Sequence, residues 1–143
     1  MLIQTCEKKD IEACARLLSA VYSGEPYNEE WDLSDAISYL ERFREIDPNG
    51  CFVAQNNGEI IGAVFSFSYP WHRGKLACIQ ELFVSSEQRM KGVARQLLAQ
   101  MGHGKKIGAW LVAHENSEAA RFYEKMGFSE KGPYKFRHGT IFV

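Results

Sequence analysis

The sequence predicts a single domain of the α/β (α+β) class over residues 1–143, and three observations support this prediction. Some segments repeat apolar residues at helical spacing, whereas others hold short apolar runs bounded by turn residues. Twice in the second half, an apolar run leads through a short turn into an amphipathic helical pattern. The 143 residues, 45% of them hydrophobic, can bury one sizeable core, and no repeat or linker divides them.

The first half of the chain predicts a strand, two helices and then three strands. Residues 2–6 are expected to form the first strand, Asp10 to cap a first helix, and Asp32 to cap a second helix that ends at residues 48–50. The apolar faces of these helices carry Ile11, Cys14, Leu17, Leu18 and Val21 in the first, and Leu33, Ala36, Ile37, Leu40 and Phe43 in the second. Residues 51–55 and 60–69 are expected to form strands joined at residues 56–58, and residues 70–74 to turn the chain into a fourth strand over residues 75–84.

The turn after the fourth strand predicts an anion site. The first amides of a helix lack intrahelical partners, and the helix dipole places roughly half a positive charge at that end. Arg89 and Lys91 add full charges there, while Gly92 and Ala94 keep the backbone accessible to a ligand. A plain helix start with a basic first turn is the alternative reading. The chain has neither a nucleoside-triphosphate loop nor a dinucleotide-binding Gly-x-Gly-x-x-Gly pattern.

The sequence from Arg89 to Ala94, Arg-x-x-Gly-x-Ala after a strand, resembles the pyrophosphate-binding motif of the GNAT family of acetyl-CoA-dependent N-acetyltransferases. A second block, residues 109–128, again predicts a strand followed by a helix. Its helix carries Ala119, Phe122, Tyr123 and Met126 on one apolar face, with Gly127 at a left-handed C-terminus. Asn116 followed seven residues later by Tyr123 resembles the family's pattern beside the pantetheine arm of the cofactor.

The resemblance implies the GNAT fold, a mixed, twisted sheet of about seven strands with helices on both faces. Strands four and five would splay apart, and residues 134–136 and 140–143 would be the closing strands. The unpaired backbone of the fourth strand would then bind acetyl-CoA as an added strand. The implied cofactor contacts are Leu82, Phe83, Val84, Arg89, Met90, Lys91, Gly92, Val93, Ala94, Arg95, Asn116 and Tyr123.

The implied reaction is direct transfer of the acetyl group from the thioester to an amine. Backbone amides at the bulge of the fourth strand, around Phe83 and Val84, would stabilise the oxyanion. Tyr123 would protonate the leaving thiolate, and a packed aromatic without a catalytic role is the alternative for Tyr123. The position that often holds a carboxylate base in the family is Gln80 here. The base is therefore expected to be Glu81, a water held by Gln80 and backbone carbonyls, or a loop carboxylate. Neighbouring strand residues point to opposite faces, so Glu81 would reach the cleft only through a bulge.

The resemblance implies that the loop of residues 22–32 forms a wall of the acceptor site. Its acidic and aromatic residues Glu25, Tyr27, Glu29 and Trp31 suit a small cationic amine, although a solvated loop pinned by its rings explains them equally well. Protein Nα- or lysine acetylation is one alternative function. A non-catalytic acetyl-CoA-binding module is another, because the usual carboxylate of the fourth strand is missing.

Composition narrows the classes of partner. The net charge of −1 favours neither nucleic acid nor an anionic membrane, and no metal-binding pattern occurs. The first residues lack the apolar core of a signal peptide, and no apolar run approaches the roughly 20 residues that span a bilayer. A cytoplasmic protein, monomeric or homodimeric, is expected. Its scattered cysteines Cys6, Cys14, Cys51 and Cys78 are expected to be reduced core thiols.

Overall fold

The structure is a computed structural model that describes residues 1–130 and 132–142, and it divides into two compact units, Met1–Val112 and Ala113–Val143. The strands are β1 (Leu2–Thr5), β2 (Cys51–Asn56), β3 (Glu59–Trp71), β4 (Gly74–Val84) and β5 (Gly108–Trp110). The α-helices are α1 (Ile11–Tyr22), α2 (Leu33–Ile46), α3 (Val93–Met101) and, in the second unit, α4 (Glu118–Lys125). Short 3₁₀ helices cover Lys8–Asp10, Pro48–Gly50 and Ser86–Gln88.

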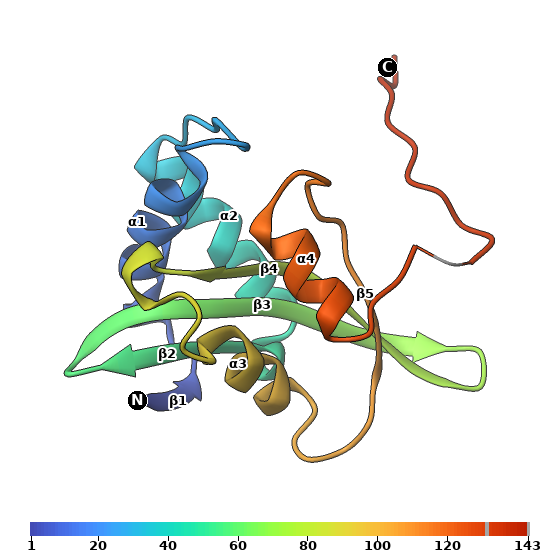
Figure 1. The fold of residues 1–143 in the computed structure, drawn as a ribbon, viewed down its shortest axis with the longest axis horizontal. Helices are drawn as coiled ribbons and strands as arrows, with labels where there is room; N and C mark the ends of the chain where they lie inside the picture. Colours follow the sequence, from blue (N-terminus) through green and yellow to red (C-terminus); the bar gives the residue numbers. More distant parts are fainter. Residues whose placement is uncertain (131, 143) are drawn as a thin grey trace. The chain divides into compact units, whose positions relative to one another are not determined.

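The five strands form one mixed sheet in the order β1-β2-β3-β4-β5 (Figure 1). The first four strands are antiparallel to their neighbours, and β5 runs parallel to β4. The predicted hairpin between β2 and β3 is confirmed, and its two turn residues have positive φ, 52° at Asn57 and 78° at Gly58. The turn after β3 is shorter than predicted. Pro70 and Trp71 still pair with β4, so only His72 and Arg73 connect the two strands.

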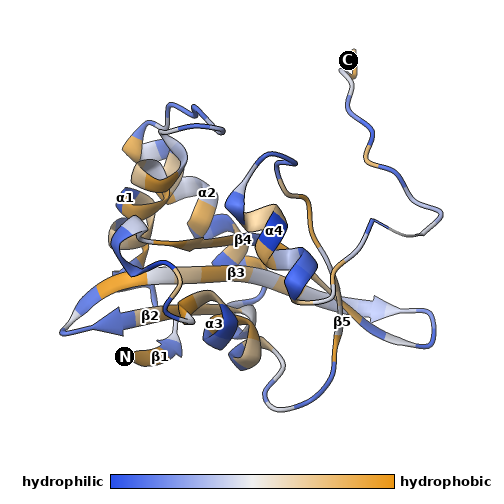
Figure 2. Cartoon of the chain, viewed as in Figure 1, coloured by the Kyte–Doolittle hydropathy of each residue, from blue (hydrophilic) through white to orange (hydrophobic). Residues whose placement is uncertain are grey.

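Helices cover both faces of this sheet, as predicted. Val53, Ala63, Phe65 and Phe83 belong to the core shared with α1 and α2. The alternate residues of the strands face α3, and a Cβ built on Gly62 would lie 3.1 Å from Val93 Cγ1 of that helix. Apolar colour concentrates in the first half of β3, and the far end of the strand is pale or blue (Figure 2). The central strands are therefore apolar on both sides, which explains their continuous hydrophobic runs.

The predicted cap of α2 is confirmed, and that of α1 is wrong in detail. The Asp32 side chain accepts a hydrogen bond from the Ser34 amide at 2.9 Å. Asp10 stands at the start of α1, but its carboxylate accepts from the Glu7 amide, three residues earlier, at 2.9 Å. Asp10 therefore caps the preceding 3₁₀ turn, because that turn leads directly into α1.

The prediction of about seven strands is not confirmed for the residues that the structure describes. Residues 134–136 and 140–142 form no strand, and Val143 lies outside the described residues. The alternation of apolar and basic residues at 134–138 suits a strand, yet a strand exists only where a neighbour accepts its backbone hydrogen bonds. The sheet therefore has five strands in the described part of the chain.

All four cysteines are buried free thiols, as predicted. Burial raises the pKa of Cys51 to about 12 and that of Cys78 to about 11, so both remain protonated and unreactive at neutral pH. Among the helices of residues 1–130 and 132–142, none has the length and apolar character needed to cross a membrane.

Candidate active site

The turn between β4 and α3 has the backbone shape that the anion-site prediction requires. After the 3₁₀ turn Ser86–Gln88, the chain passes through two residues with positive φ, Met90 at 63° and Gly92 at 81°. Gly92 is the residue that precedes α3, and its left-handed conformation directs the chain into the first helical turn. The strand, turn and helix predicted from the motif are therefore all present.

Three features of this turn favour a bound anion. Gly92 offers no side-chain cap, and the first turn of α3 contains no acidic residue. A Cβ built on Gly92 would meet no atom within 4 Å, so the space beside it is open to a ligand. Arg89, Lys91 and Arg95 are exposed around the same turn. The helix dipole and these cations act in the same direction, toward a phosphate group.

The end of β4 has a free edge beside this turn. β5 pairs with β4 only at residues 76–78, so in the described sheet residues 79–84 have β3 as their single strand neighbour. Leu82, Phe83 and Val84, the predicted pantetheine contacts, lie in this stretch. The Phe83 side chain is buried against Phe65, with ring centroids 6.3 Å apart. Phe83 can therefore serve a ligand through its backbone only.

A β-bulge lies in β4 at Gln80. Phe65 of β3 pairs with Glu81, and the next residue, Ser66, pairs with Ile79, so Gln80 is the extra residue. The side chains of Gln80 and Glu81 both reach the hydroxyl of Tyr39 on α2. Gln80 Nε2 donates to Tyr39 Oη at 2.9 Å, and Tyr39 Oη donates to Glu81 Oε2 at 2.6 Å. The bulge that Glu81 required is therefore present. It does not lie around Phe83 and Val84, where the resemblance placed it, because those two residues pair in regular register with Ala63 and Gly62.

The surroundings of Glu81 increase the proton affinity of its carboxyl. Burial raises the pKa of this carboxyl, and the negative charge of Glu29 adds to that effect. Hydrogen bonds from Tyr39 and Tyr22 act in the opposite direction but do not cancel it. Burial and the adjacent Glu81 charge also raise the pKa of Tyr39, which keeps its hydroxyl protonated. The pair is thus a phenol donor and a carboxylate whose proton affinity is increased.

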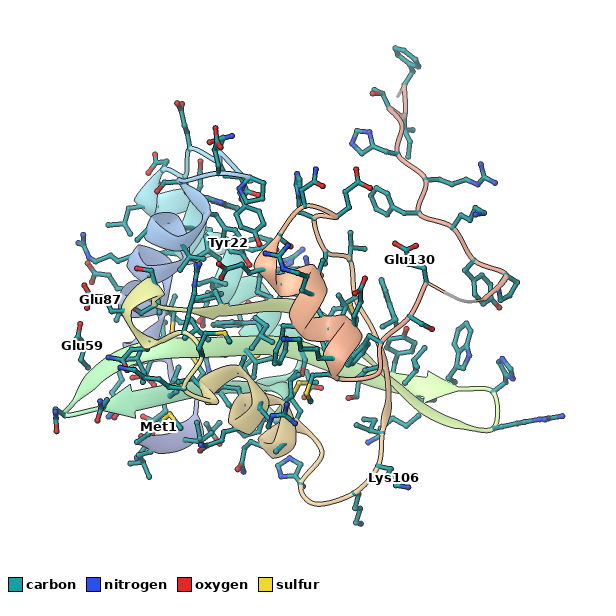
Figure 3. All side chains as sticks on the ribbon, viewed as in Figure 1. Met1, Tyr22, Glu59, Glu87, Lys106 and Glu130 are labelled. Atoms are coloured by element: carbon teal, nitrogen blue, oxygen red, sulfur yellow. The ribbon has the colours of Figure 1, made fainter. Side chains whose placement is uncertain are left out.

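Two aromatic rings from the loop of residues 23–32 pack against the two tyrosines that donate to Glu81. Tyr27 packs edge-on against Tyr22, the last residue of α1 (labelled in Figure 3), with centroids 4.7 Å apart. Trp31 lies 5.0 Å from the Tyr39 ring, and its indole N–H donates to Glu29 Oε1 at 2.7 Å. The loop rings pack against aromatic residues of α1 and α2, as one interpretation expected. Those residues, Tyr22 and Tyr39, are also the ones that hydrogen-bond to Glu81. Glu25 and Glu30 are exposed.

Tyr22 and Tyr39 were not predicted as site residues. Tyr39 lies four residues before Phe43, and the two rings are in contact at 5.2 Å. Its position beside the apolar face of α2 made it resemble an ordinary core aromatic. A tyrosine hydroxyl beside that face could have indicated a polar contact. Its partners could not be predicted, because they lie 41 and 42 residues away on β4.

The second unit contains the predicted helix of the Asn116 and Tyr123 block. Ser117 caps α4, its hydroxyl accepting from the Ala120 amide at 3.1 Å, and Gly127 has the expected positive φ of 94°. The Tyr123 ring contacts Phe122 and Phe128 at 5.4 and 5.5 Å. Asn116 is exposed. The roles of Asn116 and Tyr123 toward a cofactor stay predictions.

An open cavity of about 650 Å³ lies elsewhere in the first unit, between α1 and the β2–β3 hairpin. Lys9, Arg16, Asn57 and Glu59 are among its lining residues. None of the residues predicted for catalysis or cofactor binding lines it. This cavity is therefore separate from the candidate site at the β4 edge.

Comparison with known protein families shows to which family the chain belongs. Residues 47–130, more than half of the chain, match the model of the acetyltransferase (GNAT) domain. The chain belongs to the GNAT acetyltransferase family. The matched stretch includes the β4 edge, the basic turn and the residues from Asn116 to Tyr123, so the segments on which the resemblance rested lie inside the family match.

Similar proteins agree with this assignment. The acetyltransferase is 28% identical over 132 residues to an uncharacterised N-acetyltransferase of Archaeoglobus fulgidus, covering 86% of this chain and 89% of the relative. It is 29% identical over 102 residues to one of Methanocaldococcus jannaschii, covering 65% of this chain but only 45% of that relative's length. The crystal structure of a possible acetyltransferase from Clostridium difficile 630 has the same fold, with a TM-score of 0.78, 18% identity and coverage of 99% and 98% of the two chains.

Proposed function

We propose that this chain transfers the acetyl group of acetyl-CoA to a primary amine of a small cationic molecule, by direct attack in a ternary complex. We also propose that residues 1–143 act as one N-acetyltransferase domain. The observation that carries the proposal is the basic turn at Gly92, which opens into a helix N-terminus beside the free edge of β4. GNAT acetyltransferases generally use acetyl-CoA, and this turn has the charge and the open space that its pyrophosphate requires.

The residues present fit the cofactor in two places. The amides of Val93, Ala94 and Arg95 begin α3 and, with Arg89 and Lys91, would hold the pyrophosphate. The backbone of residues 82–84 would pair with the amides of the pantetheine arm and orient the thioester. When bound, acetyl-CoA supplies an activated acetyl group. Asn116 would hold the arm, and Tyr123 would donate a proton to the departing sulfur.

Glu81 is the proposed proton acceptor for the amine. The bulge at Gln80 directs its carboxylate toward Tyr39 and the loop residues, and its raised pKa brings it closer to the range in which a base accepts a proton near neutral pH. Gln80 already donates to Tyr39 through Nε2, which leaves its amide oxygen to hold a water. Glu29, whose carboxylate accepts from Trp31, is the nearest loop alternative.

The acceptor class follows from the groups around Glu81. Two carboxylates, Glu81 and Glu29, act on one another electrostatically. Three aromatic residues hydrogen-bond to these carboxylates, Tyr22 and Tyr39 to Glu81 and Trp31 to Glu29, and aromatic rings suit a cation. A protonated amine would relieve the carboxylate repulsion and be held by the rings. A neutral or anionic acceptor would have neither advantage.

A screen for CoA release tests the proposal. Polyamines, aminoglycosides, amino acids and peptides are offered with acetyl-CoA, and free thiol is measured. Release with a small cationic amine, lost in Glu81→Gln, supports the proposal. Release with peptides alone would assign a polypeptide acceptor and overturn the proposed acceptor class. Tight acetyl-CoA binding with no release for any amine would overturn the transfer reaction and favour a non-catalytic acetyl-CoA-binding module.

A further inference from the structure

We propose that Tyr39 is a positioning residue for the reaction: its hydroxyl, oriented by Gln80, holds Glu81 in the ionised form that accepts a proton from the amine. The inference rests on the proposed function, because it concerns the same carboxylate. Neither the family match nor the Arg-x-x-Gly-x-Ala motif includes Tyr39, which lies outside residues 47–130.

The polarity of the network follows from counting protons. A phenol has one O–H donor, and an ionised carboxylate only accepts. Gln80 Nε2 lies 2.9 Å from Tyr39 Oη and occupies it as an acceptor, so the single phenolic proton is directed to Glu81 Oε2, 2.6 Å away. This order, amide to phenol to carboxylate, gives its strongest hydrogen bond when Glu81 is ionised, because a charged acceptor strengthens the bond. A protonated Glu81 would accept from Tyr39 only through a neutral carbonyl oxygen, which is a weaker acceptor, so the Tyr39 hydroxyl favours the ionised form.

Packing fixes the Tyr39 ring independently of its hydroxyl. The ring lies between Trp31, at 5.0 Å, and Phe43, at 5.2 Å, and it belongs to α2, whose first turn Asp32 caps. The half-buried hydroxyl is thus held at the bulge with little freedom. Replacing Tyr39 with Phe removes the donor while keeping these ring contacts.

Four groups face the Glu81 carboxylate, and they act in opposite directions. Tyr39 and Tyr22 donate hydrogen bonds that lower the pKa of Glu81, whereas the Glu29 charge raises it. Gln80 acts through Tyr39. Without the Tyr39 hydroxyl, burial and Glu29 would be opposed by Tyr22 alone, and the pKa of Glu81 would rise further.

The test is a titration of Glu81 itself, which needs no acceptor. Protein labelled with ¹³C at glutamate carboxyls is titrated by NMR, and the Glu81 signal is the one missing in Glu81→Gln. In Tyr39→Phe the midpoint of this signal should move to higher pH. Tyr69→Phe is the matched control. Its hydroxyl accepts from Trp110 Nε1 at 2.6 Å, between β3 and β5, so the same atom is lost without touching Glu81.

Turnover of the amine found by the screen gives the second readout. The acid limb of the pH–rate profile should move to higher pH in Tyr39→Phe. Below this limb kcat/KM should fall by about tenfold or more, which is the scale of one charge-assisted hydrogen bond. Above the limb kcat/KM should change little. A uniform loss at every pH would mean a merely structural role. Gln80→Met should shift the limb in the same direction but less, and it serves as the test if Tyr39→Phe does not fold.

The two readouts separate the inference from the proposed function. An unchanged Glu81 midpoint in both Tyr39→Phe and Gln80→Met overturns the role of Tyr39, even if Glu81→Gln abolishes turnover. A shifted midpoint with normal turnover in Glu81→Gln supports the network and overturns Glu81 as the base.

Discussion

Tyr39 Oη donates to Glu81 Oε2 across 2.6 Å, although the two residues are 42 positions apart in the chain. The contact exists because the bulge at Gln80 turns two consecutive β4 side chains toward one hydroxyl on α2. A polar chain of this kind, beneath a loop of pinned aromatic rings, is the chemically distinctive feature of the sheet's α1–α2 face.

Gly92→Asp should weaken acetyl-CoA binding by orders of magnitude. The change places bulk and negative charge in the open space at the start of α3, where each charge-assisted hydrogen bond to the pyrophosphate is worth about 1.5–3 kcal/mol. Calorimetry measures the affinity. Gly58→Asp is the control, because Gly58 has nearly the same φ and equally open surroundings in the β2–β3 hairpin. Equal affinities in the two variants would remove the turn as the cofactor site.

Tyr123→Phe should lower turnover by about 10²-fold or more, the usual scale for losing a general acid. Its ring contacts with Phe122 and Phe128 would persist, so the thermal midpoint should stay near that of the wild type. Steady-state kinetics and thermal melting check both parts. A marked loss of stability with normal turnover would assign the hydroxyl a structural role.

Glu81→Gln should reduce turnover strongly at neutral pH, with recovery as the pH approaches the pKa of the amine, because a deprotonated amine needs no base. If a water held by Gln80 relays the proton, Gln80→Leu should cause the loss and Glu81→Gln should have little effect. The pH–rate profiles of both variants distinguish the routes. No change in either profile would direct the search to Glu25, Glu29 and Glu30.

The stability of the protein should also depend on Glu81 in a defined direction. The pKa of this carboxyl is raised in the fold, so its protonated form stabilises the folded state at low pH, and that contribution is lost as pH rises through the folded-state pKa. Glu81→Gln has no titrating carboxyl at this position, so the variant does not lose this stability as pH rises. The thermal midpoint of the variant minus that of the wild type should therefore become more positive from pH 4 to pH 8. A constant difference would mean that Glu81 titrates alike in both states.

Gly50→Ala should destabilise the protein by about 2 kcal/mol or more, the upper part of the range for overpacking. A Cβ at this position would lie 2.3 Å from the carbonyl oxygen of Ser66, the β3 residue next to the bulge. Urea denaturation measures the change. Gly24→Ala is the control, since a Cβ there meets no atom within 4 Å. Similar stabilities of the two variants would mean that β3 shifts to accommodate the added methyl group without a loss in the free energy of unfolding.

The local elements were predictable because their signals are local. Asp32 as a cap, Asn57-Gly58 as a hairpin turn and the Gly92 turn each depend on a few adjacent residues, and each is present. The closing strands were predicted and are absent from the described residues, because a strand needs a neighbour that its own residues do not specify. The cap at Asp10 differs because a preceding 3₁₀ turn competes for its carboxylate.

By itself the sequence determined the class of this protein, since the phosphate-turn motif and the block from Asn116 to Tyr123 are short and contiguous, and both lie within the family match. Only the tertiary structure decided which side chains surround Glu81. A bulge shifts the two-residue alternation of a strand by one position, and the sequence of β4 contains no sign of that shift. Tyr39 and Tyr22 come from two different helices, and packing against the sheet is what brings their hydroxyls to the same carboxylate.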